Sequence, residues 1–364
     1  MSADPDFTDY VTSYAGLIFL ATASIYTGSF ASLPTPKKKK PDDDGYEEDE
    51  EPLISEELKL EDAYWFPIIG SVMLLSLYLI IKYISIRWIN VFIQWYLSLA
   101  AVGSTWNALI TFTRRCLGTS RWKGLNYLTL TLHHNQESIL RIHYPTLTLS
   151  LVPLALFPSV VYLFFPKIMS ELHTVLTDVM ALSLSHSALA SIKLDSLLTG
   201  VVLLSGLFIY DIWWVFGSKP VFGSSVMVTV AQGLDAPIKI LFPKSKFLQS
   251  NQYTMLGLGD IVVPGFFIAF ALRYDLHRSS HQDYQQPFAK PFFAATLVAY
   301  VSALILTVVV MHTFQSAQPA LLYLSPACTL AFLAAGWSQG VWKDMWSYSD
   351  SNDSIEQQNK EKKD

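Results

Sequence analysis

Long apolar stretches recur along most of the chain and are separated by shorter polar segments. A hydrocarbon core about 30 Å thick needs roughly 20 apolar residues per crossing helix. We therefore predict an all-α membrane protein with about nine transmembrane helices. The predicted spans are residues 11–32, 64–85, 88–113, 147–166, 173–192, 198–217, 255–273, 292–313 and 318–337. The fifth of these is polar enough that hydropathy alone would not assign it.

Composition supports a membrane protein and localises its charge. Charged residues make up 15% of the chain, whereas about 25% is usual in soluble domains. Residues 1–62 contain 15 of the 30 acidic residues, and most of these follow Lys37–Lys40. This acidic run has low hydrophobicity and is predicted to be a disordered, solvated loop. The net charge of −5 therefore describes one loop, and no nucleic-acid partner is expected.

The distribution of basic residues predicts the orientation. The first span follows acidic residues and precedes the lysine run, which is unlike a cleaved signal peptide. With the N-terminus outside, 18 of the 25 Lys and Arg residues lie on the cytosolic side, as the positive-inside rule favours. The C-terminal "KEKKD" would then be cytosolic, and Lys360 and Lys362 resemble a dilysine retrieval signal for the endoplasmic reticulum. A lysine-rich solubilising tail is an equally good interpretation of these residues.

This orientation divides the chain into five predicted regions. They are a lumenal N-terminus with the first helix (1–33), a disordered charged cytosolic loop (34–63), an N-terminal helical bundle (64–192), a catalytic C-terminal bundle of spans six to nine (193–340) and a cytosolic tail (341–364). The two cysteines cannot form a disulfide framework, and the histidines lack a recognised metal-ligand spacing.

Two aspartates interrupt apolar spans. Asp211 lies in "FIYDIWWVFGS" and Asp260 in "MLGLGDIVVPG". An ionisable residue within a span costs about 2.5–3.5 kcal/mol on insertion scales, so it is a functional candidate. Neither aspartate has a basic residue three or four positions away. We therefore expect each to meet a group that is distant in sequence, and the other aspartate is the simplest candidate.

Two adjacent carboxyl groups share a proton and titrate as a pair. Aspartic proteases use such a pair to activate water and to protonate the substrate carbonyl. A proton-coupled transporter also uses intramembrane carboxylates, so this alternative stays open, as does an inactive binder of membrane segments. A purely structural role, in which each aspartate caps a helix break, is the fourth interpretation.

Residues around the two aspartates add to the candidate site. Tyr210 offers a phenol beside Asp211. Gly257, Leu258 and Gly259 precede Asp260, and the two glycines permit close helix approach or a non-helical turn. At the start of the ninth span, Pro319, with Ala320 and Leu321, should distort the first helical turn and leave backbone groups able to pair with an extended substrate.

These residues resemble the three motifs of intramembrane aspartyl proteases. "YDIWWVF", "GLGD" and "QPALLYL" occur in that family's order, on its sixth, seventh and ninth spans. The connecting "VMVTVAQGLDAPIKILFP" is similar to signal peptide peptidase rather than presenilin. The resemblance is strong over residues 192–337 and thin before residue 190. The segment Ser218–Ser224 departs from it as a short insertion.

The resemblance implies a presenilin/signal peptide peptidase-like bundle in the endoplasmic reticulum membrane. It implies that Asp211 and Asp260 are the catalytic dyad and that Pro319, Ala320 and Leu321 shape the site. The implied substrates are remnant signal peptides and type II transmembrane segments, cleaved within the lipid bilayer without a cofactor or metal. The sequence is also compatible with a homo-oligomer.

Overall fold

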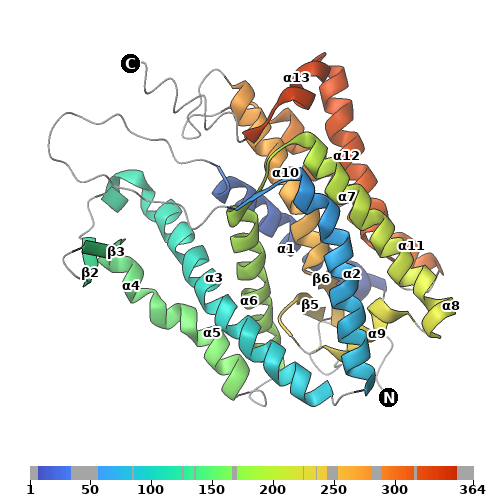
Figure 1. Ribbon diagram of the computed structural model, residues 1–364, viewed down its shortest axis with the longest axis horizontal. Helices are drawn as coiled ribbons and strands as arrows, with labels where there is room; N and C mark the ends of the chain where they lie inside the picture. Colours follow the sequence, from blue (N-terminus) through green and yellow to red (C-terminus); the bar gives the residue numbers. More distant parts are fainter. Residues whose placement is uncertain are drawn as a thin grey trace.

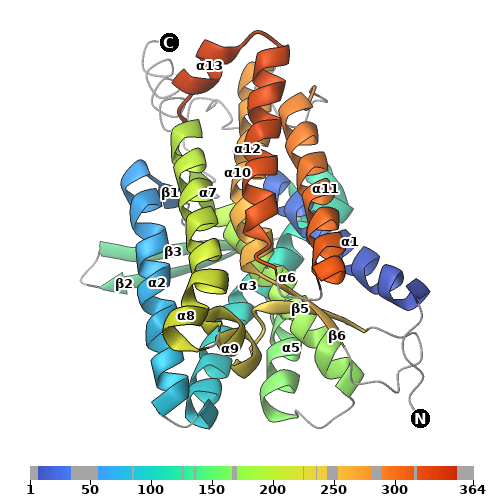
Figure 2. The same ribbon diagram turned by 90° about the vertical axis from the view of Figure 1, so that its right-hand side faces the viewer.

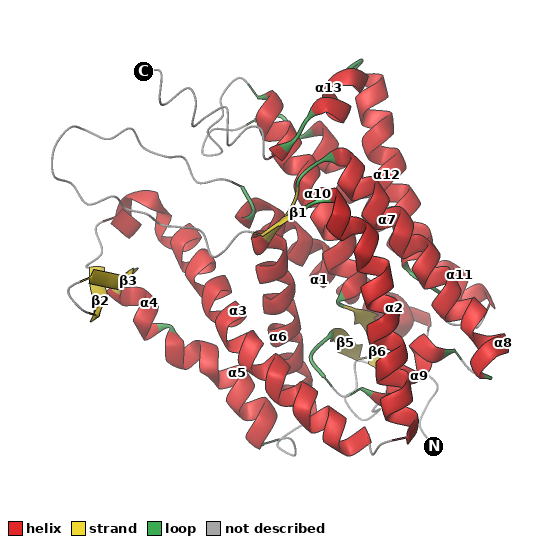
Figure 3. Cartoon of the chain, viewed as in Figure 1, coloured by secondary structure: helices red, strands yellow, loops and turns green. Residues whose placement is uncertain are grey.

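The computed structural model describes residues 7–33, 56–83, 86–123, 127–134, 137–165, 170–223, 225–234, 236–243, 253–279, 288–314 and 318–350. Helices dominate these residues, with three small strand pairs (Figures 1 and 3). The helices are α1 (Phe7–Ala31), α2 (Leu60–Tyr83), α3 (Ile86–Lys123), α4 (Thr146–Ser150), α5 (Val152–Phe164), α6 (Ser170–Ser191), α7 (Leu197–Ile212), the π-helix η1 (Trp213–Gly217), α8 (Ser218–Phe222), α9 (Val226–Gly233), α10 (Gly259–Arg278), α11 (Pro291–Phe314), α12 (Leu321–Ser338) and α13 (Trp342–Ser347). The strands are β1 (Glu56–Leu58), β2 (Tyr127–His134), β3 (Glu137–Pro145), β4 (Ile192–Leu194), β5 (Lys239–Pro243) and β6 (Tyr253–Gly257).

Helices lie at all nine predicted span positions. Among the described residues, six segments are long and apolar enough to cross a membrane by length and composition: α1, α2, α4–α5, α7–α8, α11 and α12. Helices α3, α6 and α10 fall below that threshold but pack within the same bundle. The polarity of α6 agrees with the weak hydropathy of the fifth predicted span.

Helix α10 forms the centre of the molecule. It packs against α1, α6, α7, α11 and α12, and fifteen of its twenty residues are buried. Its apolar side chains belong to one core cluster that also includes residues of α1 and α6. The predicted boundary between two bundles at residues 192 and 193 therefore does not separate two cores, since α1 and α6 pack with the C-terminal helices.

The remaining helices surround this centre. Helices α3 and α5 cover α6, and α2 covers α7 and α9 (Figures 1 and 2). Residues of α2 are largely exposed, and the buried ones are Ala63 and Tyr78. This exposure of apolar residues is typical of a surface in contact with lipid, where burial against protein is not needed.

The seventh span begins later than predicted. Residues Tyr253–Gly257 form β6, which pairs antiparallel with β5, and α10 starts only at Gly259. Hydropathy could not detect this because a short apolar strand and the first turn of an apolar helix have the same composition. The side chains of β6 alternate between buried and more exposed positions, which is the period of a strand.

The end of the loop that was predicted to be disordered is ordered, and the first part of the predicted tail is ordered as well. Strand β1 pairs in parallel with β4, and α2 begins within the predicted loop. Residues 341–350 include α13 and an antiparallel bridge between Ser196 and Ser349. These segments are fixed by pairing with distant residues, which composition does not reveal. Residues 34–55 and 351–364, including the candidate dilysine signal, lie outside the described residues.

Buried charges join these segments to α10. The Arg273 guanidinium donates to Asp350 Oδ2 (2.7 Å), Ser32 Oγ (3.1 Å) and the Leu194 carbonyl (3.4 Å). Burial and, secondarily, the positive charge of Arg273 lower the pKa of Lys193 on β4. One side chain thereby connects the end of α1, the link between α6 and α7, and the C-terminal segment. We call this set of contacts the Arg273 cluster.

The segment predicted as a short insertion, Ser218–Ser224, is largely helical. A π-helix follows α7 directly, and α8 ends at Phe222; the next residue, Gly223, has a φ of 80°, which suits a residue without a side chain. The Ser218 hydroxyl donates to the Trp214 carbonyl (2.6 Å) and accepts from the Val226 N–H (3.2 Å). Most of the predicted insertion is thus part of the helical structure below the site.

Candidate active site

Asp211 lies in the last turn of α7. The helix begins at Leu197, and the hydroxyl of the preceding residue, Ser196, caps it by accepting a hydrogen bond from the Thr199 N–H (3.3 Å). It continues through a long apolar run. The Asp211 side chain is buried. Its Oδ2 accepts a hydrogen bond from the backbone N–H of Leu321 at 3.2 Å. A residue 110 positions away therefore holds one of its carboxyl oxygens.

Asp260 lies in the first turn of α10 and is half-buried. Its backbone carbonyl accepts from the hydroxyl of Tyr300 on α11 at 3.3 Å. Gly257 lies directly beside its carboxyl group, because a Cβ added at Gly257 would be 3.5 Å from Asp260 Oδ2. A side chain larger than a methyl group at residue 257 would therefore occupy the space next to this carboxyl group.

Asp211 and Asp260 lie on two helices, α7 and α10, that pack against each other. The Asp260 carboxyl interacts electrostatically with Asp211, although the two residues are far apart in sequence. Two carboxylates that interact in a low-dielectric environment repel each other, and they can share one proton. Such a pair offers one base and one acid at the same time.

The segment before α12 forms one wall of the site. Pro319 and Leu321 are buried and Ala320 is half-buried. The Pro319 and Ala320 carbonyls accept from Leu322 and Leu324 in the first turn of α12 (3.3 and 3.1 Å). The Leu321 N–H donates a hydrogen bond to Asp211, so this donor is already paired and it orients the aspartate.

The three other predicted site residues have different surroundings. The ring of Tyr210 packs over Gly70 of α2 and near Trp214, so this side chain lies between α2 and α7. The N–H of Leu258 donates to the Ile238 carbonyl at 2.8 Å, which joins the "GLGD" turn to the chain before β5. A Cβ at Gly259 would meet no atom within 4 Å.

Tyr300 and Asp178 are not among the residues predicted from the sequence. Tyr300 carries no local signal, because it acts through a tertiary contact with the Asp260 carbonyl. Asp178 on α6 does carry one: it is an acidic residue within the fifth predicted span. The rule that selected Asp211 and Asp260 applies to it as well.

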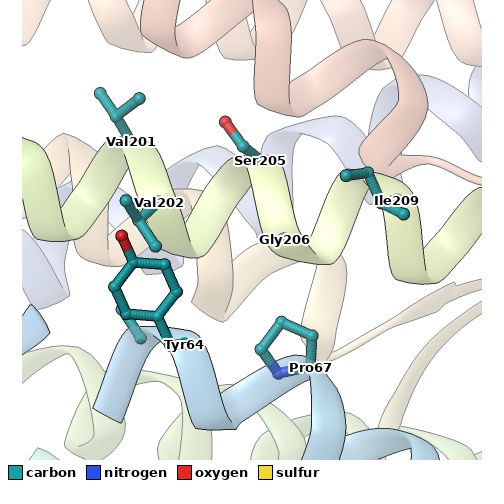
Figure 4. Close-up of a pocket in the computed structure, with 8 residues that line it drawn as sticks. Tyr64, Pro67, Val201, Val202, Ser205, Gly206 and Ile209 are labelled. Atoms are coloured by element: carbon teal, nitrogen blue, oxygen red, sulfur yellow. The ribbon is translucent and has the colours of Figure 1, made fainter. Parts of the chain in front are cut away.

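An apolar groove opens between α2 and α7 near the site (Figure 4). It has a volume of about 280 Å³ and is lined by Ala63, Tyr64, Pro67, Val201, Val202, Ser205, Gly206 and Ile209. Ile209 lies two residues before Asp211. The helices approach most closely at Gly206, where an added Cβ would be 2.8 Å from the Pro67 ring.

Comparison with known proteins agrees with the motifs. Residues 50–352 match the family described as Signal peptide peptidase. Signal peptide peptidase of Homo sapiens is 33% identical over 345 residues, covering 93% of this chain and 84% of the human protein. A probable intramembrane protease of Schizosaccharomyces pombe is 31% identical over 344 residues, covering 94% of this chain and 98% of the yeast protein.

The similarity extends well beyond the three motifs, because it includes the helices before residue 190 where motif resemblance is thin. It therefore decides among the alternatives that the paired carboxylates left open, and it favours the protease over the transporter and the inactive binder. The chain belongs to the signal peptide peptidase family and is a multi-pass intramembrane aspartyl protease that acts on peptide substrates.

Proposed function

We propose that Asp211 and Asp260 are the catalytic pair of this protease. The observation that carries the proposal is the packing of α7 against α10, which places the two carboxyl groups in electrostatic interaction, in a setting where neither has another charged partner at helical spacing. Its substrates are remnant signal peptides and type II transmembrane segments. We place the enzyme in the endoplasmic reticulum membrane, with a lumenal N-terminus and a cytosolic C-terminus, because 18 of 25 basic residues then face the cytosol.

The mechanism needs a water molecule and one proton shared by the pair. One aspartate deprotonates the water, which attacks the scissile carbonyl, while the other donates a proton to the carbonyl oxygen. The Leu321 N–H holds Oδ2 of Asp211, so Oδ1 is the oxygen left to face water or substrate. Pro319, Ala320 and Leu321 thus act by orienting Asp211, and Gly257 leaves room beside Asp260.

A transmembrane substrate must lose its helical hydrogen bonds before cleavage. We assign its approach to the groove between α2 and α7, which is apolar and ends near Asp211. Strand β6 has one edge paired with β5 and no second strand on its other edge among the described residues. An unwound substrate could pair with this edge, immediately before Gly257 and Asp260, by strand addition.

The decisive test is cleavage of a labelled signal peptide by the purified, detergent-solubilised protein. Asp211→Ala and Asp260→Ala should each reduce kcat by at least about a thousandfold, as for other removed catalytic groups. Asp62→Ala is the matched control, because Asp62 is an exposed aspartate at the start of α2 that accepts from the Lys59 N–H. Substantial activity in either dyad variant would contradict the assignment, as would activity insensitive to an aspartyl-protease transition-state analogue.

A further inference from the structure

A third carboxylate lies inside the bundle but outside the catalytic pair. Asp178 belongs to α6 and is half-buried. Its Oδ1 accepts a hydrogen bond from the backbone N–H of Leu241 at 2.8 Å. Leu241 is the central residue of β5, so the side chain of a bundle helix binds the backbone of the hairpin.

This hydrogen bond pairs a backbone donor that β6 does not reach. Strand β5 pairs with β6 through one edge, with Leu241 opposite Met255. The Leu241 N–H that reaches Asp178 serves the other edge, where no further strand pairs among the described residues. A backbone donor that is removed from water and has no partner is strongly unfavourable. The carboxylate of Asp178 supplies the missing acceptor.

Helix α1 holds the same strand from another direction. The Ser13 hydroxyl donates to the Pro243 carbonyl at 2.5 Å. The Phe242 ring packs so tightly on Gly16 that a Cβ there would overlap it. Strand β5 is thus fixed between α1 and α6 by contacts at three consecutive residues, as its position in Figure 2 also indicates.

The hairpin leads directly into the catalytic turn. Strand β6 ends at Gly257, and the next residue, Leu258, donates its N–H to the Ile238 carbonyl just before β5. Asp260 follows two residues later. A displacement of β5 would therefore be transmitted through β6 to the start of α10, which carries Asp260.

We propose that Asp178 is a positioning residue for catalysis: it anchors the β5–β6 hairpin on α6 so that Asp260 is held opposite Asp211. This inference rests on the proposed catalytic role of Asp260. Asp178 has no part in proton transfer in this scheme, because its bound oxygen acts only as an acceptor for the Leu241 N–H. An uncharged acceptor of the same shape should therefore replace it.

The test compares Asp178→Ala with Asp178→Asn in the full-length, solubilised enzyme, using the labelled signal peptide. Asp178→Ala should lower kcat by on the order of 10- to 100-fold, the effect of a misplaced reacting group, with KM changed less than about twofold. Asp178→Asn keeps an oxygen acceptor and should restore kcat to within about threefold of wild type. Thr177→Val is the matched control, since the Thr177 hydroxyl bonds within α6 to the His173 carbonyl.

The pH profile separates positioning from proton transfer. We expect the pH dependence of kcat to keep its shape in both Asp178 variants. Equal loss in Asp178→Asn and Asp178→Ala, or a displaced profile, would overturn the positioning role and assign Asp178 a proton-transfer function. Wild-type kcat in Asp178→Ala would also overturn it.

Two further variants keep the test decisive. If Asp178→Ala does not fold, as judged by gel filtration and thermal unfolding, Ser13→Ala replaces it by loosening β5 from α1. A fall in kcat without a change in KM then supports the inference, and an unchanged kcat overturns it. Asp260→Ala is measured in parallel: activity in that variant would refute the catalytic pair itself, whereas its inactivity beside fully active Asp178 variants would refute only the anchor.

Discussion

Helices α10 and α2 meet different faces of α7, the helix that carries Asp211, and they do so in different ways. Fifteen of the twenty residues of α10 are buried, whereas α2 buries only Ala63 and Tyr78 among its described residues. A Cβ at Gly200 would be 2.7 Å from Phe267 of α10, a fully buried ring. A Cβ at Gly206 would be 2.8 Å from Pro67 of α2, beside the groove.

This difference predicts separate roles for α10 and α2 around the site. Helix α10 is fixed by core packing and by the Arg273 cluster, so it can hold Asp260 in one position. Helix α2 packs against α7, α9 and α3, but most of its own side chains stay exposed. We expect changes on the α10 face to affect stability first, and changes on the α2 face to affect substrate access first.

The largest expected effect on stability is at the Arg273 cluster. Asp350→Ala leaves a buried guanidinium without its carboxylate and should lower the free energy of unfolding by about 3 kcal/mol. Thermal unfolding in detergent measures this change. Gln339→Ala is the control, since it removes the exposed contact between Arg278 and Gln339 and should change stability by less than about 0.5 kcal/mol. Equal losses in the two variants would show that the cluster does not stabilise α10.

Gly200→Ala probes the α10 face of α7 directly. The added methyl group overlaps the Phe267 ring, which is buried on all sides, so overpacking should cost about 1–3 kcal/mol of unfolding free energy. Thermal unfolding again reports the effect. Unchanged stability would mean that α7 and α10 separate more easily than their packing indicates.

Gly206→Ala makes the same substitution on the α2 face of the same helix. The methyl group displaces the Pro67 ring, but α2 can move outward into lipid, so the cost should be below about 1 kcal/mol. Because the groove changes shape, we expect KM for a transmembrane substrate to change more than kcat. Kinetics at several substrate concentrations measure both. A stability loss equal to that of Gly200→Ala would remove the distinction between the two faces.

A comparably small effect is expected at a polar contact between α2 and η1. The Trp214 indole N–H donates to the Ser71 hydroxyl at 3.0 Å. Ser71→Ala removes the acceptor and should cost about 0.5–1.5 kcal/mol. Ser302→Ala is the control, because the Ser302 hydroxyl bonds to Val298 of its own helix at an exposed position. Identical unfolding temperatures for the two variants would indicate that α2 gains no stability from this bond.

The positions of the nine helices were predictable because crossing a membrane imposes a length that can be read along the chain. The two aspartates were predictable for a related reason: a carboxyl within an apolar run is costly wherever the helix lies, so Asp211 and Asp260 could be selected before any contact was known. Family motifs then added the wall formed by Pro319, Ala320 and Leu321. Asp178 could have been selected by the same rule.

Each contact between segments distant in sequence depended on the tertiary structure. The sequence by itself determined the spans, the membrane class and the residues of the candidate pair, since these follow from local composition. Only the folded chain decided that Leu321 orients Asp211, that Tyr210 packs on α2, and that a hairpin replaces the start of the seventh span. The physical reason is that backbone donors and strand edges carry no signature in residue type, and their partners are chosen by packing.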